Sequence, residues 1–194
     1  MNYLGHLYLS DTDDLHRLGN IAGDWVKGPL QGHDLPARVL EGVRRHRWVD
    51  GTTDRHPAVR EAHRLFSPER RRAVPIIMDM MFDHFLAVNW SDHSDIPLNA
   101  FLADSYAALN RTRPHWPVRA RRVLPGIIER DLLGQYRDIQ VIAHSLERIA
   151  DRVSRDIGLR GALPEIQRNL TLLEDIHVAV LADLEKQLKT SGIR

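Results

Sequence analysis

The segment from Pro75 to Trp90, PIIMDMMFDHFLAVNW, most constrains how this chain can fold. Read as a helix, it is apolar on almost every side, which is the pattern of a helix buried inside a protein. Its ionisable side chains are Asp79, Asp83 and His84. A buried carboxylate without a partner costs several kcal/mol or shifts its pKa so that it stays neutral. The central Asp83 therefore needs a partner, and a cation would supply one.

The rest of the sequence predicts an all-α protein with a single domain over residues 1–194. Strict alternation of apolar and polar residues, which marks half-buried strands, is absent from the sequence. No linker is long enough to divide the chain into domains. We expect a bundle of about seven to nine helices. The main ones are predicted at residues 2–9, 13–27, 34–50, 57–66, 75–90, 97–110, 135–157 and 164–188, with short helices broken by prolines over 111–134.

The composition excludes several classes of protein. The chain has no cysteine, so disulfides, thiolate metal sites and a cysteine nucleophile are excluded. No apolar run approaches the ~20 residues of a membrane span, and the N-terminus does not resemble a secretion signal. We therefore expect a cytoplasmic protein that does not bind membranes. The net charge of +1 argues against a nonspecific nucleic-acid binder.

The basic residues are unevenly distributed. Of the 27 basic residues only three are lysines, and the arginines form clusters such as Arg44-Arg45 and Arg70-Arg71-Arg72. One interpretation is that these clusters are solvated helix faces with ion pairs inside the helix. The other is that a cluster contacts a small acidic partner or a phosphate.

The third expected helix carries a histidine and an aspartate on its inward face. At 100° per residue, His46 and Asp50 continue the face begun by Val39 and Val43, and their spacing of four lets the two side chains meet. A plain hydrogen bond between them is the alternative interpretation. We expect the helix to weaken after Asp50, because residues 51–53, Gly-Thr-Thr, have low helix propensity.

Two further segments carry candidate polar groups. Gly19 and Gly23 inside the second expected helix indicate a close approach of another backbone. Each glycine is followed directly by a polar residue, Asn20 or Asp24, and these two are four residues apart. An exposed Asp24 is the alternative interpretation. His6 stands in an otherwise apolar stretch, where a buried histidine with a hydrogen-bond partner is the alternative to a functional one.

Taken together, carboxylates and imidazoles on several helices predict a metal site, because helical proteins build metal sites in this way. Oxygen and nitrogen ligands without sulfur suit Mn²⁺ or Mg²⁺ and tolerate Fe or Zn. A divalent ion lowers the pKa of bound water and neutralises phosphate oxygens. Arg47, beside His46, could hold a phosphate oxygen with its planar guanidinium. The expected reaction is hydrolysis of a phosphoester.

Several segments of the chain resemble the bacterial acyl carrier protein phosphodiesterases, also called acyl carrier protein hydrolases. These segments are MNYLGHLYL at 1–9, GNIAGDWVKG at 19–28, HRWVDGTTD at 46–54 and MFDHFLAVNW at 81–90, and the similarity extends to YRD at 136–138. The resemblance implies removal of the 4′-phosphopantetheine arm from the serine of holo acyl carrier protein. The products would be apo carrier protein and 4′-phosphopantetheine. It also implies an HD-domain-like helical fold, although the pair Asp83-His84 reverses the order of the HD signature.

The resemblance also implies roles for particular residues. Manganese is the usual metal of the family, with Mg²⁺ or another divalent ion as the alternative. The implied metal ligands are Asp24, His46, Asp50 and Asp83. His6 and His84 would lie close to the metal, and each would act as a ligand, a base or the acid that protonates the leaving group. Arg47 would stabilise the negative charge of the phosphate.

The implied partner is holo acyl carrier protein, which is small and acidic. Arg44 and Arg45 lie off the inward face of their helix, so we expect both to point outward and to dock the carrier. Two alternatives remain open from the sequence. One is an HD-type phosphohydrolase that acts on a nucleotide or another small phosphoester, and the other is a non-catalytic helical binding module.

Overall fold

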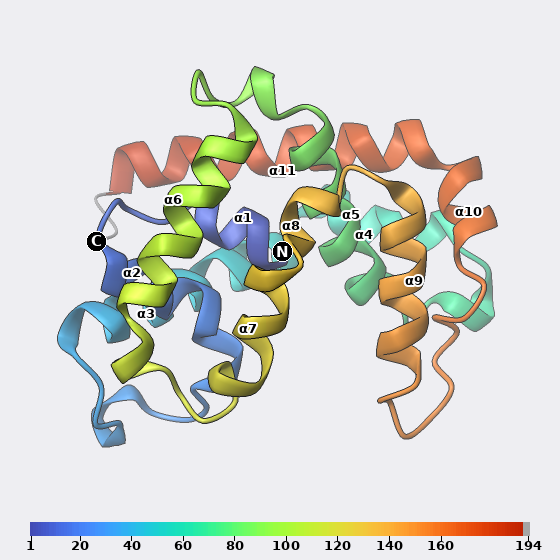
Figure 1. Ribbon diagram of the computed structural model, residues 1–194. Coiled ribbons are helices and arrows are strands. Elements are labelled where there is room, and N and C mark those ends of the chain that lie inside the picture. The colour runs from blue at the N-terminus through green and yellow to red at the C-terminus, as the bar shows by residue number, and fades with distance from the viewer. Residues whose placement is uncertain (192–194) are drawn as a thin grey trace.

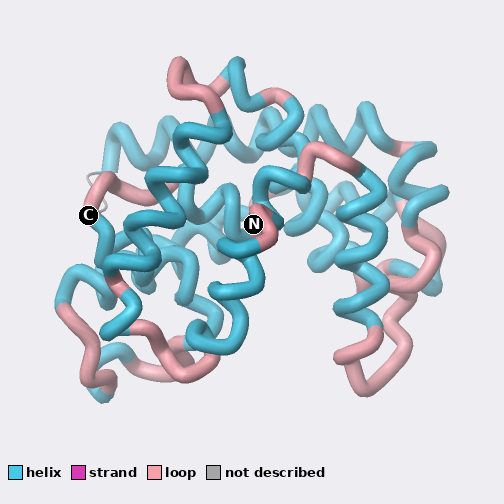
Figure 2. Tube along the Cα trace, viewed as in Figure 1, coloured by secondary structure: helices cyan, strands magenta, loops and turns pink. Residues whose placement is uncertain are grey.

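Helices are the regular secondary structure of residues 1–191, the part of the chain that this computed structural model describes (Figure 1). Figure 2 shows helices joined by loops, with no strand in the described part, so the all-α prediction is confirmed. The α-helices of this part are α1 (Tyr3–Tyr8), α2 (Asp14–Ala22), α3 (Ala37–Arg55), α4 (Pro57–Ala62), α5 (Val74–Val88), α6 (Leu98–Arg111), α7 (Ala120–Glu129), α8 (Leu132–Gln135), α9 (Ile139–Ala150), α10 (Leu163–Arg168) and α11 (Leu170–Ser191).

The described residues form eleven α-helices, more than the seven to nine predicted, partly because predicted helices are interrupted. The predicted last helix is divided at Asn169, whose side chain donates hydrogen bonds to the carbonyl oxygens of Leu65 at 2.8 Å and Glu165 at 2.9 Å. The predicted second helix ends at Ala22 and continues as the 3₁₀ turn η1 (Gly23–Trp25). A side-chain bond to the carbonyl four residues earlier, such as that of Asn169 to Glu165, competes with the helical hydrogen-bond pattern.

The expectation that the third helix weakens after Asp50 is wrong, because α3 continues to Arg55. Thr53 is buried in the interior, with 2% of its surface exposed, so packing outweighs the low helix propensity of residues 51–53. The helix ends where His56 takes an extended conformation before Pro57. A residue before proline disfavours the helical conformation, which explains this end point.

Helix α5 is the buried centre of the fold, as its apolar sequence predicts. Its side chains from Ile77 to Ala87 are almost all buried, and it packs against α1, α9 and α11. In Figure 1, α11 runs along the top of the view, past α6 and α5, and reaches α10 at the other end. Helix α5 therefore supports α1, which carries His6.

Helices α2 and α3 pack backbone against backbone. A Cβ atom on Gly19 would lie 2.0 Å from the carbonyl oxygen of Val39, and one on Gly42 would lie 2.2 Å from that of His16. Only glycine permits such an approach, which confirms the close contact predicted from Gly19. As a result, the main chain of α2 lies directly beside the inward face of α3.

Within the described part of the chain, none of the helices combines the length and the apolar character that crossing a bilayer requires.

Candidate metal centre

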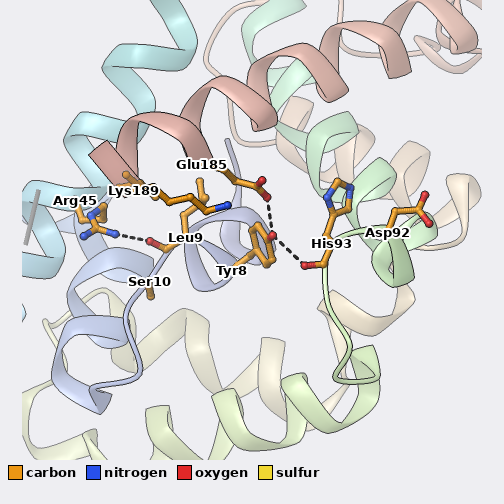
Figure 3. A pocket seen from close by; sticks show the side chains of 9 residues that line it. Tyr8, Leu9, Ser10, Arg45, Asp92, His93, Glu185 and Lys189 are labelled. Atoms are coloured by element: carbon orange, nitrogen blue, oxygen red, sulfur yellow. Dashed lines mark hydrogen bonds between the residues drawn. The ribbon is translucent and has the colours of Figure 1, made fainter. Parts of the chain in front are cut away.

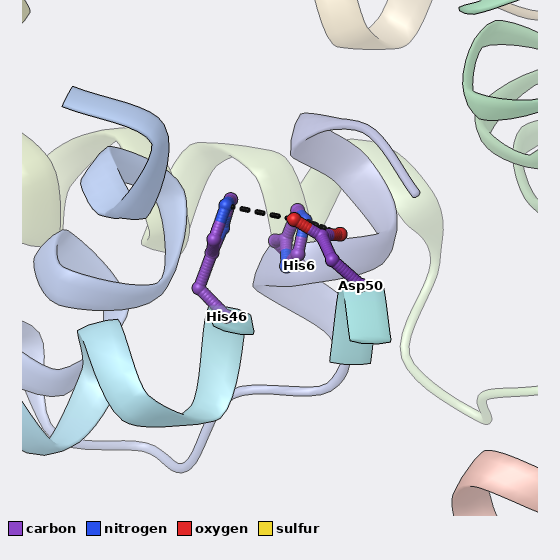
Figure 4. Close-up of side chains that lie close together, drawn as sticks. All are labelled: His6, His46 and Asp50. Carbon is purple, nitrogen blue, oxygen red and sulfur yellow. Dashed lines mark ion pairs between the residues drawn. The ribbon is translucent and has the colours of Figure 1, made fainter. Parts of the chain in front are cut away.

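Two histidines and an aspartate converge where α1 meets α3. Figure 4 shows His6 from α1 facing His46 and Asp50 from α3. The Nε2 atom of His6 lies 3.2 Å from Oδ1 of Asp50, and the Nε2 atom of His46 lies 3.0 Å from Oδ2. The two imidazole rings are stacked with their centroids 4.0 Å apart. Among residues 1–191, this is the one place where three His, Asp or Glu ligand atoms lie within 4.8 Å of one another.

The far side of each imidazole is bonded to Asn20. The Nδ1 atom of His6 lies 3.1 Å from the side-chain oxygen of Asn20, and the Nδ1 atom of His46 lies 2.7 Å from its main-chain oxygen. Amide oxygens only accept hydrogen bonds, so both Nδ1 atoms carry the proton. In a neutral imidazole the remaining lone pair is then on Nε2, which faces Asp50.

The inward-facing atoms of the group lack hydrogen-bond partners. The Nε2 atoms of His6 and His46 and the Oδ1 atom of Asp50 are buried, and no described residue forms a hydrogen bond of good geometry with them. Lone pairs that face one another across about 3 Å are unfavourable unless a proton or a cation lies between them. The arrangement therefore has the geometry and the chemistry of a set of metal ligands.

The electrostatics of the three residues are strongly coupled. Burial disfavours the charged form of His46, but the carboxylates of Asp24 and Asp50 outweigh it and raise the pKa of His46 to about 9. Burial and the neighbouring His46 lower the pKa of His6. Burial would raise the pKa of Asp50, yet the attraction of the two nearby imidazoles holds it well below its usual range. Asp50 is therefore an anion at neutral pH.

Asp24 lies at the rim of this group. Its Oδ1 atom is 3.7 Å from Nε2 of His46, and its side chain is 64% exposed. The turn that carries it can pass over the His46 ring only because Gly23 has no side chain, since a Cβ atom there would lie 2.2 Å from Cγ of the ring. The structure thus brings together His6 and three of the four predicted ligands, namely Asp24, His46 and Asp50.

The fourth predicted ligand, Asp83, has a different set of partners. It is fully buried, and its two oxygens accept hydrogen bonds from the main-chain N–H groups of Leu4 at 2.8 Å and Gly5 at 3.0 Å. These N–H groups belong to the first turn of α1, where a helix has no internal acceptors for them. Burial raises the pKa of Asp83 to about 7 in spite of these bonds. Asp83 therefore caps α1 and is not one of the three converging groups.

His84 also lies outside the group. Its Nδ1 atom donates a hydrogen bond of 2.8 Å to the carbonyl oxygen of Tyr136, and its ring centroid is 5.4 Å from that of Phe85. Burial lowers its pKa. Because Asp83 and His84 are adjacent on a helix, they point in directions about 100° apart and contact different neighbours.

The predicted arginines divide into exposed and buried ones. Arg44 is exposed as expected, whereas the expectation that Arg45 points outward is wrong, because only 8% of its surface is accessible. Its guanidinium reaches back and donates a 2.8 Å hydrogen bond to the carbonyl oxygen of Leu9, just after α1. A long side chain can bury its stem while its head meets such an unsatisfied carbonyl. Arg45 lines a pocket of about 450 Å³, and Figure 3 shows it beside Leu9 and Lys189, which also line that pocket.

Arg47 was predicted to hold a phosphate oxygen. In the structure its guanidinium donates hydrogen bonds of 2.8 Å to the carbonyl oxygens of Val26 and Gly28. These bonds hold in place the loop that follows η1, and η1 is the turn that carries Asp24. The guanidinium has main-chain partners here and is not one of the groups that converge on Asp50.

Asn20 was missed as a functional residue by the sequence reasoning. It is fully buried and contacts both imidazoles. The signal was present in the sequence, since Asn20 follows Gly19 in the segment whose glycines predict close backbone contact. An amide side chain at a closely packed position needs hydrogen-bond partners, and the candidate partners were the predicted histidines.

Comparison with known proteins identifies relatives of the whole chain. The family described as acyl carrier protein phosphodiesterase matches residues 1–184. Proteins named acyl carrier protein phosphodiesterase from Salmonella dublin, Salmonella newport (strain SL254) and Salmonella heidelberg (strain SL476) are each 36% identical over 176 residues. The matched region covers 90% of this chain and 91% of each relative. No solved structure matches the chain. The chain therefore belongs to the acyl carrier protein phosphodiesterase family.

Proposed function

We propose that this protein is a metal-dependent phosphodiesterase that hydrolyses the 4′-phosphopantetheine arm from the serine of holo acyl carrier protein. The family match and the names of the relatives support the reaction class. The observation that carries the proposal is the convergence of His6, His46 and Asp50, with both Nε2 atoms directed at one carboxylate. The products are apo carrier protein and 4′-phosphopantetheine.

The residues of the centre fit a divalent ion. Two imidazole nitrogens and a carboxylate, without sulfur, suit Mn²⁺ and also Mg²⁺, Fe²⁺ or Zn²⁺. His6, His46 and Asp50 would hold the ion, and Asp24 would add a second carboxylate from the rim. Such an ion, when bound, neutralises the charge on phosphate oxygens and lowers the pKa of a bound water. Manganese is the ion that we propose, because the family resemblance implies it.

The exposure of the centre suits a phosphate that is attached to a protein. His6 and His46 are buried, whereas the carboxylate of Asp50 is one-third exposed and that of Asp24 lies largely in solvent. The centre is thus open on the side of the two carboxylates. In holo acyl carrier protein the scissile bond joins the phosphate to a serine of the carrier. A centre that is shallow on one side lets such a phosphate reach the ligands while the carrier stays outside.

One exposed residue near the centre remains a candidate contact for the carrier. Arg44 lies on α3, two residues before His46, and its side chain is exposed. We propose that it contributes to docking of the acidic carrier through charge attraction. The buried Arg45 cannot form such a contact without leaving the carbonyl oxygen of Leu9.

The test is a mass measurement on a carrier protein. Purified protein is stripped of metal, reloaded with Mn²⁺ and incubated with holo acyl carrier protein. We expect the carrier to lose the mass of the arm, with 4′-phosphopantetheine released, only in the metal-loaded sample. The Asp50→Ala variant serves as the control for contaminating hydrolases.

The outcomes of this experiment separate the alternatives. An unchanged carrier mass, together with hydrolysis of a small phosphodiester, would replace the proposal with a phosphohydrolase of small substrates. An unchanged mass in a protein that also fails to retain Mn²⁺ would point to a non-catalytic binding module.

A further inference from the structure

A single buried residue contacts both candidate histidine ligands through different atoms. The side-chain oxygen of Asn20 faces Nδ1 of His6 at 3.1 Å, and its main-chain oxygen faces Nδ1 of His46 at 2.7 Å. The residue is fully buried, and it comes from α2, which carries none of the three converging groups. Asn20 therefore contacts the two histidines on the side of each ring that faces away from Asp50.

The orientation of the Asn20 amide is fixed by its other end. The Nδ2 atom donates hydrogen bonds to the carbonyl oxygen of His6 at 2.6 Å and to the hydroxyl of Ser10 at 2.9 Å. Ser10 can accept this bond because its own proton is donated to the His6 carbonyl at 2.8 Å. A reversed amide would place two oxygens against each other. The side-chain oxygen must therefore face Nδ1 of His6.

A proton on Nε2 of His6, in place of Nδ1, would prevent this histidine from binding a metal ion. Its Nε2 atom is 3.2 Å from Oδ1 of Asp50, within hydrogen-bond reach. A proton on Nε2 would be donated to this carboxylate, and the ring would then offer no lone pair to a metal. The acceptor that Asn20 provides on the opposite side of the ring works against this arrangement.

We propose that Asn20 is a positioning residue, which keeps both imidazoles protonated on Nδ1 and so directs both Nε2 lone pairs toward a bound metal ion. The inference rests on the proposed metal-dependent function. The side chain of Asn20 acts on His6, whereas its main chain acts on His46. A side-chain substitution should therefore change the first histidine and spare the second, which a general loss of structure would not do.

The first test uses long-range ¹H–¹⁵N NMR to read which ring nitrogens of His6 and His46 carry protons in metal-free protein. In the wild type, we expect neutral His6 with its proton on Nδ1. In Asn20→Leu, which removes the acceptor but keeps a similar volume, we expect the proton of His6 to move to Nε2. His46 keeps a proton on Nδ1 in both proteins, because its partner is a main-chain carbonyl. In Asn20→Asp, one carboxyl oxygen still faces His6, and a proton on the other can be donated to the His6 carbonyl oxygen, so we expect the wild-type tautomer.

The second test measures the Kd of Mn²⁺ by titration calorimetry. Loss of the hydrogen-bond partner of a metal-bound histidine typically weakens metal affinity by about 10–100-fold, and we expect this loss for Asn20→Leu. Asn20→Asp should stay within about tenfold of the wild type, because it retains the acceptor. Leu146→Ala removes buried packing from α9, which carries no site residue, and it should leave the Kd unchanged while lowering the melting temperature.

The outcomes distinguish this inference from the proposed function. Wild-type tautomers and wild-type affinity in Asn20→Leu would overturn the role of Asn20. If the wild-type protein binds no Mn²⁺, the proposed metal-dependent function is overturned instead. The NMR experiment needs no metal, so it would still test whether Asn20 sets the tautomer of His6. If Asn20→Leu does not fold, Ser10→Ala removes one of the two bonds that orient the amide. A several-fold weaker Kd is then expected, and an unchanged Kd would overturn the inference.

Discussion

Two clusters of side chains that each contain a buried histidine differ in the charge that they can hold. In the first, His6 and His46 lie against Asp50 and Asn20. In the second, His177 of α11 is 1% exposed and lies among aromatic rings. Its neighbours, with their centroid distances, are Phe82 at 5.6 Å, Phe85 at 5.8 Å and His93 at 6.1 Å.

The pKa values of His46 and His177 move in opposite directions. Burial, together with His93 and His84, lowers the pKa of His177 to about 3, whereas the carboxylates beside His46 overcome burial and raise its pKa to about 9. Neither ring nitrogen of His177 has a hydrogen-bond partner among the described residues. Burial alone thus makes a neutral histidine that fills space. A carboxylate in front and a carbonyl behind are what make an imidazole fit to bind a metal.

The largest effect is expected when the first cluster loses its carboxylate. Asp50→Ala removes the group that lies between both Nε2 atoms, so we expect loss of bound Mn²⁺ and of carrier hydrolysis. The loss of activity should exceed the ~10–100-fold that follows from loss of a ligand's hydrogen-bond partner. Metal analysis and the carrier mass assay measure both. His177→Leu is the matched control from the second cluster, and it should retain metal and activity. If the Asp50→Ala protein still bound one Mn²⁺ per chain, the first cluster would not be the metal site, and this difference between the clusters would be lost.

The next effect concerns Asp83 of α5, which accepts hydrogen bonds from the first turn of α1. Asp83→Ala leaves the buried N–H groups of Leu4 and Gly5 without acceptors, at about 1–3 kcal/mol for each group. We therefore expect the free energy of unfolding to fall by roughly 2–6 kcal/mol, as measured by urea denaturation. Asp83→Asn keeps one acceptor oxygen and should lose less. The metal-to-protein ratio should stay at the wild-type value. Metal loss without a loss of stability would instead make Asp83 a ligand, as the sequence predicts.

A smaller effect is expected on the pH dependence of stability, through His177 of the second cluster. His177 has a folded-state pKa of about 3, below the value of about 6.5 expected in the unfolded chain. Between these values the unfolded chain binds one more proton at this site, so stability falls as the pH drops. The slope is about 1.4 kcal/mol per pH unit. His177→Leu should remove this contribution, which urea denaturation of both proteins at about pH 7 and about pH 5 would reveal. An equal pH dependence in both proteins would show that His177 does not titrate in this range.

The parts of the site that the sequence predicts are those that follow from one helix. His46 and Asp50 share a face at a spacing of four, so helical geometry alone places their side chains together. The burial of α5 likewise follows from its apolar sequence. The partner of Asp83 does not follow in this way, because it depends on which helix end lies against α5. A buried carboxylate needs donors, and the sequence cannot distinguish a metal ion from the N-terminus of α1.

The same limit explains the other differences from the sequence-based expectations. Helical angles give the direction of the Cβ atom of Arg45, but its long side chain bends back to a carbonyl of another segment. Asn20 becomes part of the site only because Gly19 and Gly42 bring the backbones of α2 and α3 together. Both contacts join residues that are distant in the sequence, so they depend on tertiary packing, which no local pattern contains.

The smallest effect is expected on the outer face of α3, whose inner face carries His46 and Asp50. Arg44→Glu reverses an exposed charge, so we expect KM for holo carrier protein to rise about two- to fivefold, with kcat and metal binding unchanged. Charge attraction between exposed groups is screened by salt, so the difference in KM should shrink at high ionic strength. Hydrolysis of a small phosphodiester should be unaffected, because it does not use the docking surface. Arg45→Glu is the contrasting variant. It reverses the charge of a buried side chain, so its main effect should be a loss of stability and not a change in KM. An equal loss on both substrates in Arg44→Glu would place Arg44 in the chemistry of the centre and not in docking.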